Sequence, residues 1–353
     1  MMCSARMIRR FPARRPRKAC RVAGQDRVKG CGVRKDIVAV LALVASVLIW
    51  GTTFVVSAST LASLSPAVLT VARFAVALVV LGPLAAGRRG LGYAVRSGRV
   101  AALGATGVAA YFGLQNIGLL TTSAGTAALL QAALPVAIAV LAATCLRERY
   151  TAQVVVGLIL VTAGVVLVAG GDRAGLGPGA VLILLGVLGY AIYTVLLRGQ
   201  PDCDPIVLAT ATCMWGLLWL LPWQVWEIAV GAARLSLDRG AALSVLYLGV
   251  AASALTLPLW TYGASRLPGS TSGAFTAMIP AVGYVCAVLS GESATSAKTA
   301  GSLLAVFGTV LVTCKRAGTM SRSHHDEDVN AAGLAATRPI ARGTAKPGSE
   351  AKS

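Results

Sequence analysis

Hydrophobic residues gather in runs along the middle of the chain, and short polar stretches separate these runs. A helix needs about 20 apolar residues to cross the roughly 30 Å hydrocarbon layer of a bilayer. Each run is therefore predicted to be a transmembrane helix, which makes the chain an all-α integral membrane protein. Ten such helices are predicted, at 37–57, 67–86, 100–120, 124–145, 152–170, 179–197, 206–226, 241–262, 270–291 and 297–314.

The composition agrees with this prediction. Hydrophobic residues make up 56% of the 353 residues, and charged residues only 13%. A soluble domain carries about 25% charged residues, because water must wet its surface. Much of this surface must face lipid instead, so the bilayer is the first expected partner.

The charge pattern predicts an orientation. The net charge is +19, and a basic patch can also indicate nucleic acid. With the N-terminus inside, however, 27 of the 32 Lys and Arg residues fall on the inside and four outside, with Arg73 left in a membrane segment. Cytoplasmic loops carry such an excess. We therefore expect no nucleic acid partner, and a plasma (inner) membrane protein with both termini in the cytoplasm.

Two polar tails flank the hydrophobic part. Residues 1–35 are expected to be a disordered basic tail, or sequence upstream of a later start such as Met7. Residues 317–353 are polar and poor in aromatic side chains, so they are expected to be a disordered C-terminal tail.

The hydrophobic part reads as a duplication. The segment GLLTTSAGTAALLQAALP, which ends at Pro135, aligns without gaps with GASRLPGSTSGAFTAMIP, which ends at Pro280. This alignment predicts one five-helix repeat at 37–170 and a second at 179–314. Because five is odd, the second copy enters the membrane from the opposite side. Inverted repeats of this kind are common in secondary transporters.

Short motifs follow one another in a fixed order through both repeats. They are Trp50-Gly51, Pro66, Arg73-Phe74, Pro135 with Arg147-Glu148-Arg149, and Pro280 with Gly291-Glu292-Ser293. In these motifs the chain resembles the EamA-like permeases, the ten-helix branch of the drug/metabolite transporter superfamily. The resemblance implies a gradient-driven exporter or importer of small metabolites, amino acids or related solutes. We expect an exporter that works by alternating access, with a small-molecule substrate and no ATP. No phosphate-binding loop contradicts this.

Arg73 is the only charged residue well inside a predicted helix, where ionisable groups are costly. No acidic residue lies mid-helix, so backbone carbonyls, Trp50, a polar helix end or an anionic substrate must neutralise it. Arg73 therefore either binds or gates a carboxylate, or is a structural residue that snorkels or caps a helix. With Pro66 set against Pro205, Thr212 takes the mirrored position, so only one half carries this charge.

Polar and aromatic residues inside the helices are the candidates for a solute pathway. Each of them could instead bond a neighbouring helix, but as a set they predict a path near the midplane. The pathway residues are Trp50, Arg73, Tyr111, Gln115, Asn116, Gln131, Tyr190, Tyr193, Ser272, Thr276 and Tyr284. Pro135 and Pro280 are predicted hinges, because each removes a helical hydrogen bond.

Other residue types predict packing rather than chemistry. Gly157 with Gly164, and Gly301 with Gly308, share helix faces and suit close packing, with a homodimer contact as one option. Glu148 and Glu292 are expected to fix helix ends, and a proton-coupling role is the alternative.

The sequence argues against an enzyme. The only histidines lie in the C-terminal tail, and the eight cysteines lack metal-binding spacing, so we expect no metal site and no cofactor. The alternatives to a transporter are a membrane-embedded enzyme acting on a lipid-linked substrate and a non-transporting scaffold that binds partners through its tails.

Overall fold

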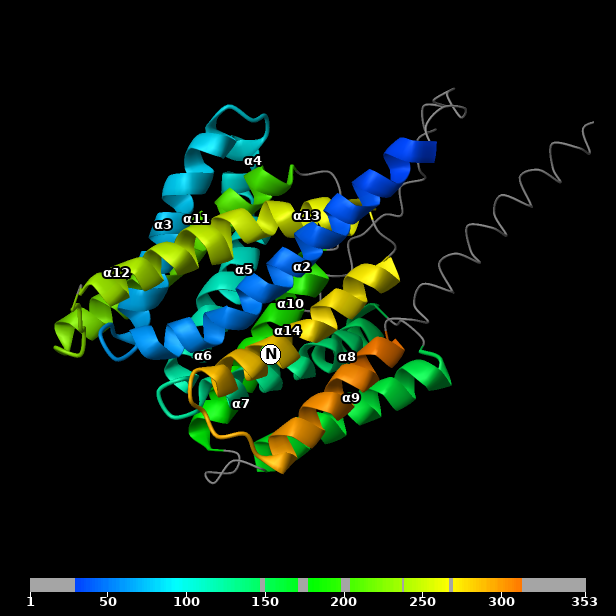
Figure 1. Ribbon diagram of the computed structural model, residues 1–353. Coiled ribbons are helices and arrows are strands. Elements are labelled where there is room, and N and C mark those ends of the chain that lie inside the picture. Colours follow the sequence, from blue (N-terminus) through cyan, green and yellow to red (C-terminus); the bar gives the residue numbers. More distant parts are fainter. Residues whose placement is uncertain are drawn as a thin grey trace, which may run out of the picture.

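The computed structural model describes residues 29–146, 150–170, 177–197, 204–236, 238–266 and 269–312. In these ranges the regular structure is helical, and one isolated antiparallel bridge joins Leu64 to Leu235. Figure 1 shows the long helices side by side in one bundle. The prediction of an all-α membrane protein is confirmed.

The first half of the chain supplies the helices up to Gly170. They are α2 (Lys29–Thr60), α3 (Pro66–Ala86), α4 (Leu91–Arg96), α5 (Gly98–Gly104), η1 (Ala105–Ala110), α6 (Tyr111–Gly118), α7 (Ala124–Leu130), η2 (Gln131–Ala133), α8 (Leu134–Leu146) and α9 (Ala152–Gly170).

The second half supplies the helices from Pro178 onward. Its helices are α10 (Pro178–Leu197), α11 (Pro205–Ala229), α12 (Arg239–Leu246), η3 (Tyr247–Leu255), α13 (Thr256–Arg266), α14 (Gly269–Leu289) and a last helix, Ser296–Val312.

Membrane spans account for most of this structure. Within the described residues, eight helical stretches are long and apolar enough to cross a bilayer, and Met278–Leu289 and Ser296–Val312 are shorter apolar helices. Large apolar side chains such as Val79 and Leu303 are exposed on the outside of the bundle, as lipid contact requires. The chain is therefore a multi-pass membrane protein.

The helices α3 and α11 begin in the same way. Each has a proline at its first position, where the missing N–H costs nothing and the fixed φ suits a helix. Ser65 precedes the first and Asp204 the second, and the Asp204 carboxylate accepts hydrogen bonds from the amides of Ile206 and Val207.

Two π-helical segments break the regular helices at matching positions. The alignment that sets Gly118 against Gly263 places η1 opposite residues 250–255, which lie within η3. Such segments occur frequently at functional sites. Nothing in the sequence analysis predicted them.

The two predicted hinge prolines differ in their surroundings. The α-helix tightens into the 3₁₀ turn η2 directly before Pro135, where the missing N–H interrupts the hydrogen-bond ladder. In contrast, α14 stays α-helical through Pro280.

Helices from equivalent positions in the two halves pack against each other in opposite directions. Thr210, near the start of α11, donates to the carbonyl of Leu81 late in α3, whereas Glu227 at the end of α11 binds Ser65. In the same way Gly125, at the start of α7, lies against Ala287, near the end of α14.

The seven-residue glycine pairs also join equivalent helices. A Cβ added to Gly157 would lie 2.8 Å from the carbonyl oxygen of Gly308, and one added to Gly164 would lie 2.6 Å from that of Gly301. Figure 1 shows α9 beside the orange last helix. These glycines are packing positions, as predicted, and they face each other inside one chain, so the homodimer stays a prediction without a contact assigned to it.

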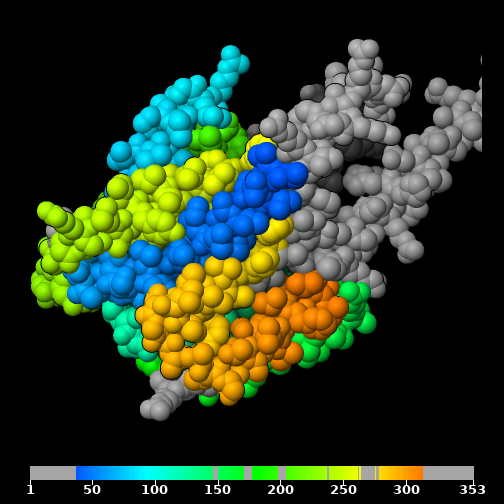
Figure 2. Space-filling view, viewed as in Figure 1, coloured from blue at the N-terminus to red at the C-terminus, as the bar shows by residue number. Residues whose placement is uncertain are grey.

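The halves interlock elsewhere too. Figure 2 shows α2, in blue, with helices of the second half on both sides, and α2 packs against both α13 and α14. The bundle is therefore one body rather than two separate lobes.

Candidate functional site

Arg73 is buried in α3 with 3% of its surface exposed. Its Nε donates to the hydroxyl of Ser253 at 2.9 Å, and its guanidinium carbon lies 4.4 Å from the ring centre of Phe112. That ring offers its negative face to the charge. Across the described residues, no carboxylate pairs with Arg73 and no hydrogen bond reaches its Nη atoms.

The π-helical segment η3 brings Ser253 to this position. The Ser253 hydroxyl donates to the carbonyl of Leu248, five residues earlier, as the wider π-turn allows. Gly249 lets η3 approach α3, because a Cβ there would lie 2.9 Å from the carbonyl oxygen of Arg73.

A polar network lies on α6 and η2. The Tyr111 hydroxyl donates to Oε1 of Gln131 at 3.1 Å, and Nε2 of Gln131 donates to Oε1 of Gln115 at 3.3 Å. Gln115 is 2% exposed and Gln131 8%, so both amide side chains are buried, whereas Tyr111 is half-buried.

A row of rings joins this network to Arg73. Neighbouring ring centres are 5.1 Å apart from Tyr193 to Tyr190, 4.8 Å from Tyr190 to Tyr111, and 4.6 Å from Tyr111 to Phe112. Arg73 lies over the last ring. The structure thus brings six predicted pathway residues together: Arg73, Tyr111, Gln115, Gln131, Tyr190 and Tyr193. We call these six, with Phe112 and Ser253, the central cluster.

Three other predicted pathway residues make their contacts with residues outside the central cluster. Trp50 packs on Trp260 and its indole N–H donates to the carbonyl of Ala252, so it is not the partner of Arg73. Asn116 donates to the Thr70 hydroxyl at 2.8 Å. Tyr284 contacts Thr299 of the last helix.

The remaining pathway predictions cannot be placed. Ser272 and Thr276 lie in α14, but their side chains are outside the described residues. Glu148 is outside them as well.

Sequence reasoning missed Phe112 and Ser253. Phe112 directly follows a flagged tyrosine, yet phenylalanine in an apolar run looks like any lipid-facing residue. Ser253 lies 180 residues from Arg73 and carried no signal at all.

A hollow of about 360 Å³ is lined by residues other than those of the central cluster. Apolar residues of η1, α6 and α11 line it, including Trp219 and Trp223, and it contains none of the predicted pathway residues. An apolar hollow on the outside of a membrane bundle suits lipid chains better than a polar solute.

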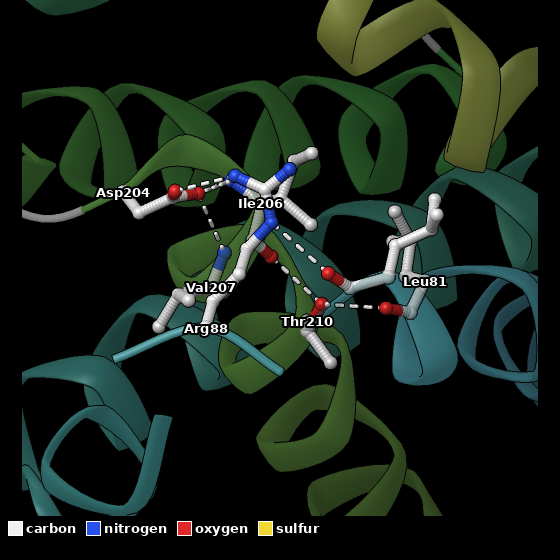
Figure 3. Close-up of polar contacts among 7 residues, drawn as sticks. Leu81, Arg88, Asp204, Ile206, Val207 and Thr210 are labelled. Atoms are coloured by element: carbon white, nitrogen blue, oxygen red, sulfur yellow. Dashed lines mark hydrogen bonds and ion pairs between the residues drawn. The ribbon is translucent and has the colours of Figure 1, made fainter. Parts of the chain in front are cut away.

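Carboxylates join the helix ends on both sides of the cluster. Figure 3 shows Asp204 paired with Arg88, at an N–O distance of 2.6 Å, beside the first turn of α11. At the other end of α11, the buried Glu227 accepts hydrogen bonds from the Ser65 hydroxyl and the Ala67 amide. Glu292 binds the amide of Gly125 and so contacts the start of α7.

Hydrogen bonding changes the acidity of Asp204. Desolvation acts to raise the pKa of Asp204, but the hydrogen bonds from Arg88 and from the amides of Ile206 and Val207 outweigh it. The pKa therefore lies below its usual range, and the pair with Arg88 stays charged at neutral pH.

The fold and the central cluster define a multi-pass membrane protein with a polar, aromatic interior. The EamA-like transporter family matches residues 37–170 and again residues 177–314. The chain belongs to the EamA-like transporter family, part of the drug/metabolite transporter superfamily, and contains its domain twice. The resemblance seen in the sequence is confirmed.

Two relatives and one solved structure extend this result. An "uncharacterized transporter" of Archaeoglobus fulgidus is 28% identical over 78% of this chain and 99% of its own length. A "probable terminal-alkyne amino-acid exporter" of Streptantibioticus cattleyicolor is 31% identical over 79% and 95%. A crystal structure with 20% identity covers 80% of this chain and 98% of its own, with a TM-score of 0.58, which supports the fold alone.

Proposed function

We propose that this chain is a secondary transporter that exports a small solute with a carboxylate group, such as an amino acid, across the plasma membrane. The observation that carries the proposal is Arg73, a buried cation with no acidic partner in the described part of the chain. An unpaired charge at membrane depth is costly unless a ligand neutralises it.

The chemistry of the central cluster fits such a solute. A guanidinium presents a planar set of donors that matches a carboxylate. The rings of Tyr111, Tyr190 and Tyr193 offer faces that attract an ammonium group, at about 0.5–2 kcal/mol each. A zwitterion can therefore bind between Arg73 and the tyrosines. The relative named an amino-acid exporter supports the same class and favours a transporter over an enzyme or a scaffold.

Alternating access needs two halves that can exchange roles. We propose ten transmembrane helices in two inverted five-helix repeats, at 37–170 and 179–314. The antiparallel packing of equivalent helices supports this arrangement. Such halves can rock about a central site, with the 3₁₀ turn before Pro135 as one hinge and Pro280 as its counterpart.

The loop contacts support the proposed sidedness. The bridge between Leu64 and Leu235, and the bond between Glu292 and Gly125, join loops that the charge pattern assigns to the outside. The pair of Arg88 and Asp204 joins loops assigned to the cytoplasm.

The test is flux in proteoliposomes with a panel of labelled L-amino acids that includes one with a terminal alkyne. We expect flux that depends on a gradient and is insensitive to ATP. Replacing Arg73 with Ala should lower flux by about tenfold or more, as loss of a charged hydrogen-bond partner does. Thr212→Ala, at the mirrored position, is the matched control and should keep its flux. Unchanged flux in Arg73→Ala would remove Arg73 from the mechanism.

A further inference from the structure

The helices α3 and α11 are joined at both ends by equivalent contacts. With Pro66 matched to Pro205, Ser65 corresponds to Asp204 and Arg88 corresponds to Glu227. At one end Arg88 binds Asp204, and at the other Glu227 binds Ser65. Each contact thus joins the residue that precedes one helix to a residue at the far end of the other.

This reciprocity is what a two-fold axis produces, because residue i meets j while j meets i. We call the two contacts the Asp204 clasp and the Glu227 clasp. They lie at opposite ends of the same helix pair, so each can hold one end closed while the other end opens.

The two clasps differ in their chemistry. The Asp204 clasp is an ion pair at the surface, with side-chain exposures of 42% for Arg88 and 33% for Asp204. Because the pKa of Asp204 is lowered, moderate acidification leaves this pair intact.

The Glu227 clasp is buried, and no cation pairs with it in the described part of the chain. Glu227 is 5% exposed, and its carboxylate accepts from the Ser65 hydroxyl at 2.5 Å and from the Ala67 amide at 3.3 Å. Among the acidic side chains that the structure describes, it alone is buried. Both donors belong to the first turn of α3, where the helix dipole favours a negative charge.

The charged groups nearest the Glu227 clasp bind other partners, start the next helix or lie further along α3. On the connector after α11, Arg234 donates to the carbonyl of Leu61, and Asp238 accepts from Ser63 and from the amide of Ala241. Arg239 begins the next helix. On α3 the next charged residue is Arg73, two turns further in, which binds Ser253.

We propose that Glu227 is a proton-sensitive gating residue, whose carboxylate holds the start of α3 against α11 and whose protonation opens that end. The proposal rests on the transport function proposed above. A proton on the carboxylate removes the charge that the Ala67 amide and the helix dipole stabilise, so the clasp weakens.

A nearby oxygen can accept a hydrogen bond from the protonated carboxyl. Oε1 of Gln224 is buried and has no hydrogen-bond partner within the described ranges. Gln224 lies three residues before Glu227 on α11, and residues at this spacing share a helix face. The O–H of a neutral Glu227 therefore has an oxygen within reach on its own helix.

Opening the Glu227 clasp would affect the central cluster, because α3 connects the two. Arg73 lies two turns from the clasp on the same helix, and its bond to Ser253 fixes α3 against η3. Movement of the start of α3 therefore changes the position of the cation that the solute meets. Glu227 acts as a positioning residue, because it touches α3 and not the solute.

The first test is hydrogen–deuterium exchange of the full-length protein in detergent. At one pD, Glu227→Gln mimics the protonated carboxyl and should speed exchange of amides at residues 64–70 by about fivefold or more. The matched control is Asp204→Asn, which keeps a good helix cap and breaks only the other clasp. It should leave residues 64–70 unchanged. If Glu227→Gln leaves them unchanged as well, the proposal is wrong.

The second test is amino-acid flux with the two faces of the vesicle buffered separately. Wild-type flux should depend on the pH at the face that carries Glu227. In Glu227→Gln the flux should no longer change with the pH at that face. Ser65→Ala keeps the carboxyl and removes only the hydroxyl donor, so its flux should still depend on pH.

The outcomes separate the two proposals. A merely structural Glu227 would lower flux in Glu227→Gln without flattening the pH profile, which contradicts gating. Absence of flux for every amino acid in the panel would count against the transport function instead, and the exchange measurement would still decide whether the clasp responds to the carboxyl charge.

Discussion

Arg73 donates a hydrogen bond to the Ser253 hydroxyl and lies over the Phe112 ring, and neither partner is charged. A carboxylate partner would have closed the guanidinium within a buried ion pair, which is hard to open for a ligand. Ser253 and Phe112 stabilise the cation only in part. No described residue bonds to the Nη atoms of Arg73, so these donors would be available to the proposed carboxylate solute.

Asp204 yields a stability prediction with a defined pH range. Asp204→Ala removes the cap of α11 and should lower the free energy of unfolding by about 1 kcal/mol. Asp204→Asn keeps a cap and loses only an exposed ion pair, so it should lower the free energy of unfolding by about 0.3 kcal/mol. The measurement is the thermal unfolding midpoint in detergent.

The pH dependence of this effect follows from the lowered pKa of Asp204. A carboxylate with a lowered pKa contributes stability above its unfolded value, here 3.8, and loses it as pH falls through the folded pKa. The difference between wild type and Asp204→Asn should therefore be constant near neutral pH and shrink below about pH 4. A difference that disappears already near pH 6 would contradict the assignment.

The sequence predicted part of the site because of how rare its residues are. Arg73 stands out as a lone charge in an apolar run, and Gln131 as an amide near a proline. Ser253 does not stand out, because a serine among small apolar residues is common in membrane helices. Its role comes from a contact across 180 residues, which periodicity cannot show.

At the scale of helices, the π-helical segments explain how α3 and α11 come so close to their neighbours. Gly249 of η3 lies against Arg73 and Val76, and Gly104, directly before η1, lies against Trp215 and the carbonyl oxygen of Thr212. Apolar runs show where a helix lies but not where its hydrogen bonds shift register. The sequence therefore predicted the helices and missed these segments.

These glycines give a prediction at the same scale. Gly249→Ala and Gly104→Ala each place a Cβ within 3 Å of a backbone oxygen, and such overpacking should cost about 1–3 kcal/mol. Gly82→Ala in α3 is the control, because a Cβ there meets nothing within 4 Å. Its midpoint should stay the same or rise, since alanine favours helix. Equal losses in all three variants would contradict the close approach.

At the scale of the whole molecule, the predicted orientation came from the charge count and the predicted duplication came from the repeat alignment. Both depend on features that a single sequence shows, namely basic residues in short loops and matching prolines. What they could not give is which helices touch. The packing of α2 against α13 and α14 arises from side-chain fit between distant segments.

The orientation can be tested directly. A reporter active only in the cytoplasm should give signal when fused to either terminus or inserted at residues 87–90. The same reporter inserted at residues 120–123 should give none, because the positive-inside pattern assigns that loop to the outside. Signal from both internal sites would contradict the proposed topology.

The mirrored pair of Arg73 and Thr212 has a consequence for the energetics of the cycle. Their carbonyl oxygens make equivalent contacts with Gly249 and Gly104, yet only one of the two side chains is charged. If Arg73 binds the solute as proposed, an anion would be anchored to the first half alone, whichever face is open. The distance from the entrance to Arg73 would then differ between the state that is open to the inside and the state that is open to the outside. In the proposed transport cycle, the apparent affinity for the same solute should therefore differ between the two faces of the membrane even when no gradient is applied.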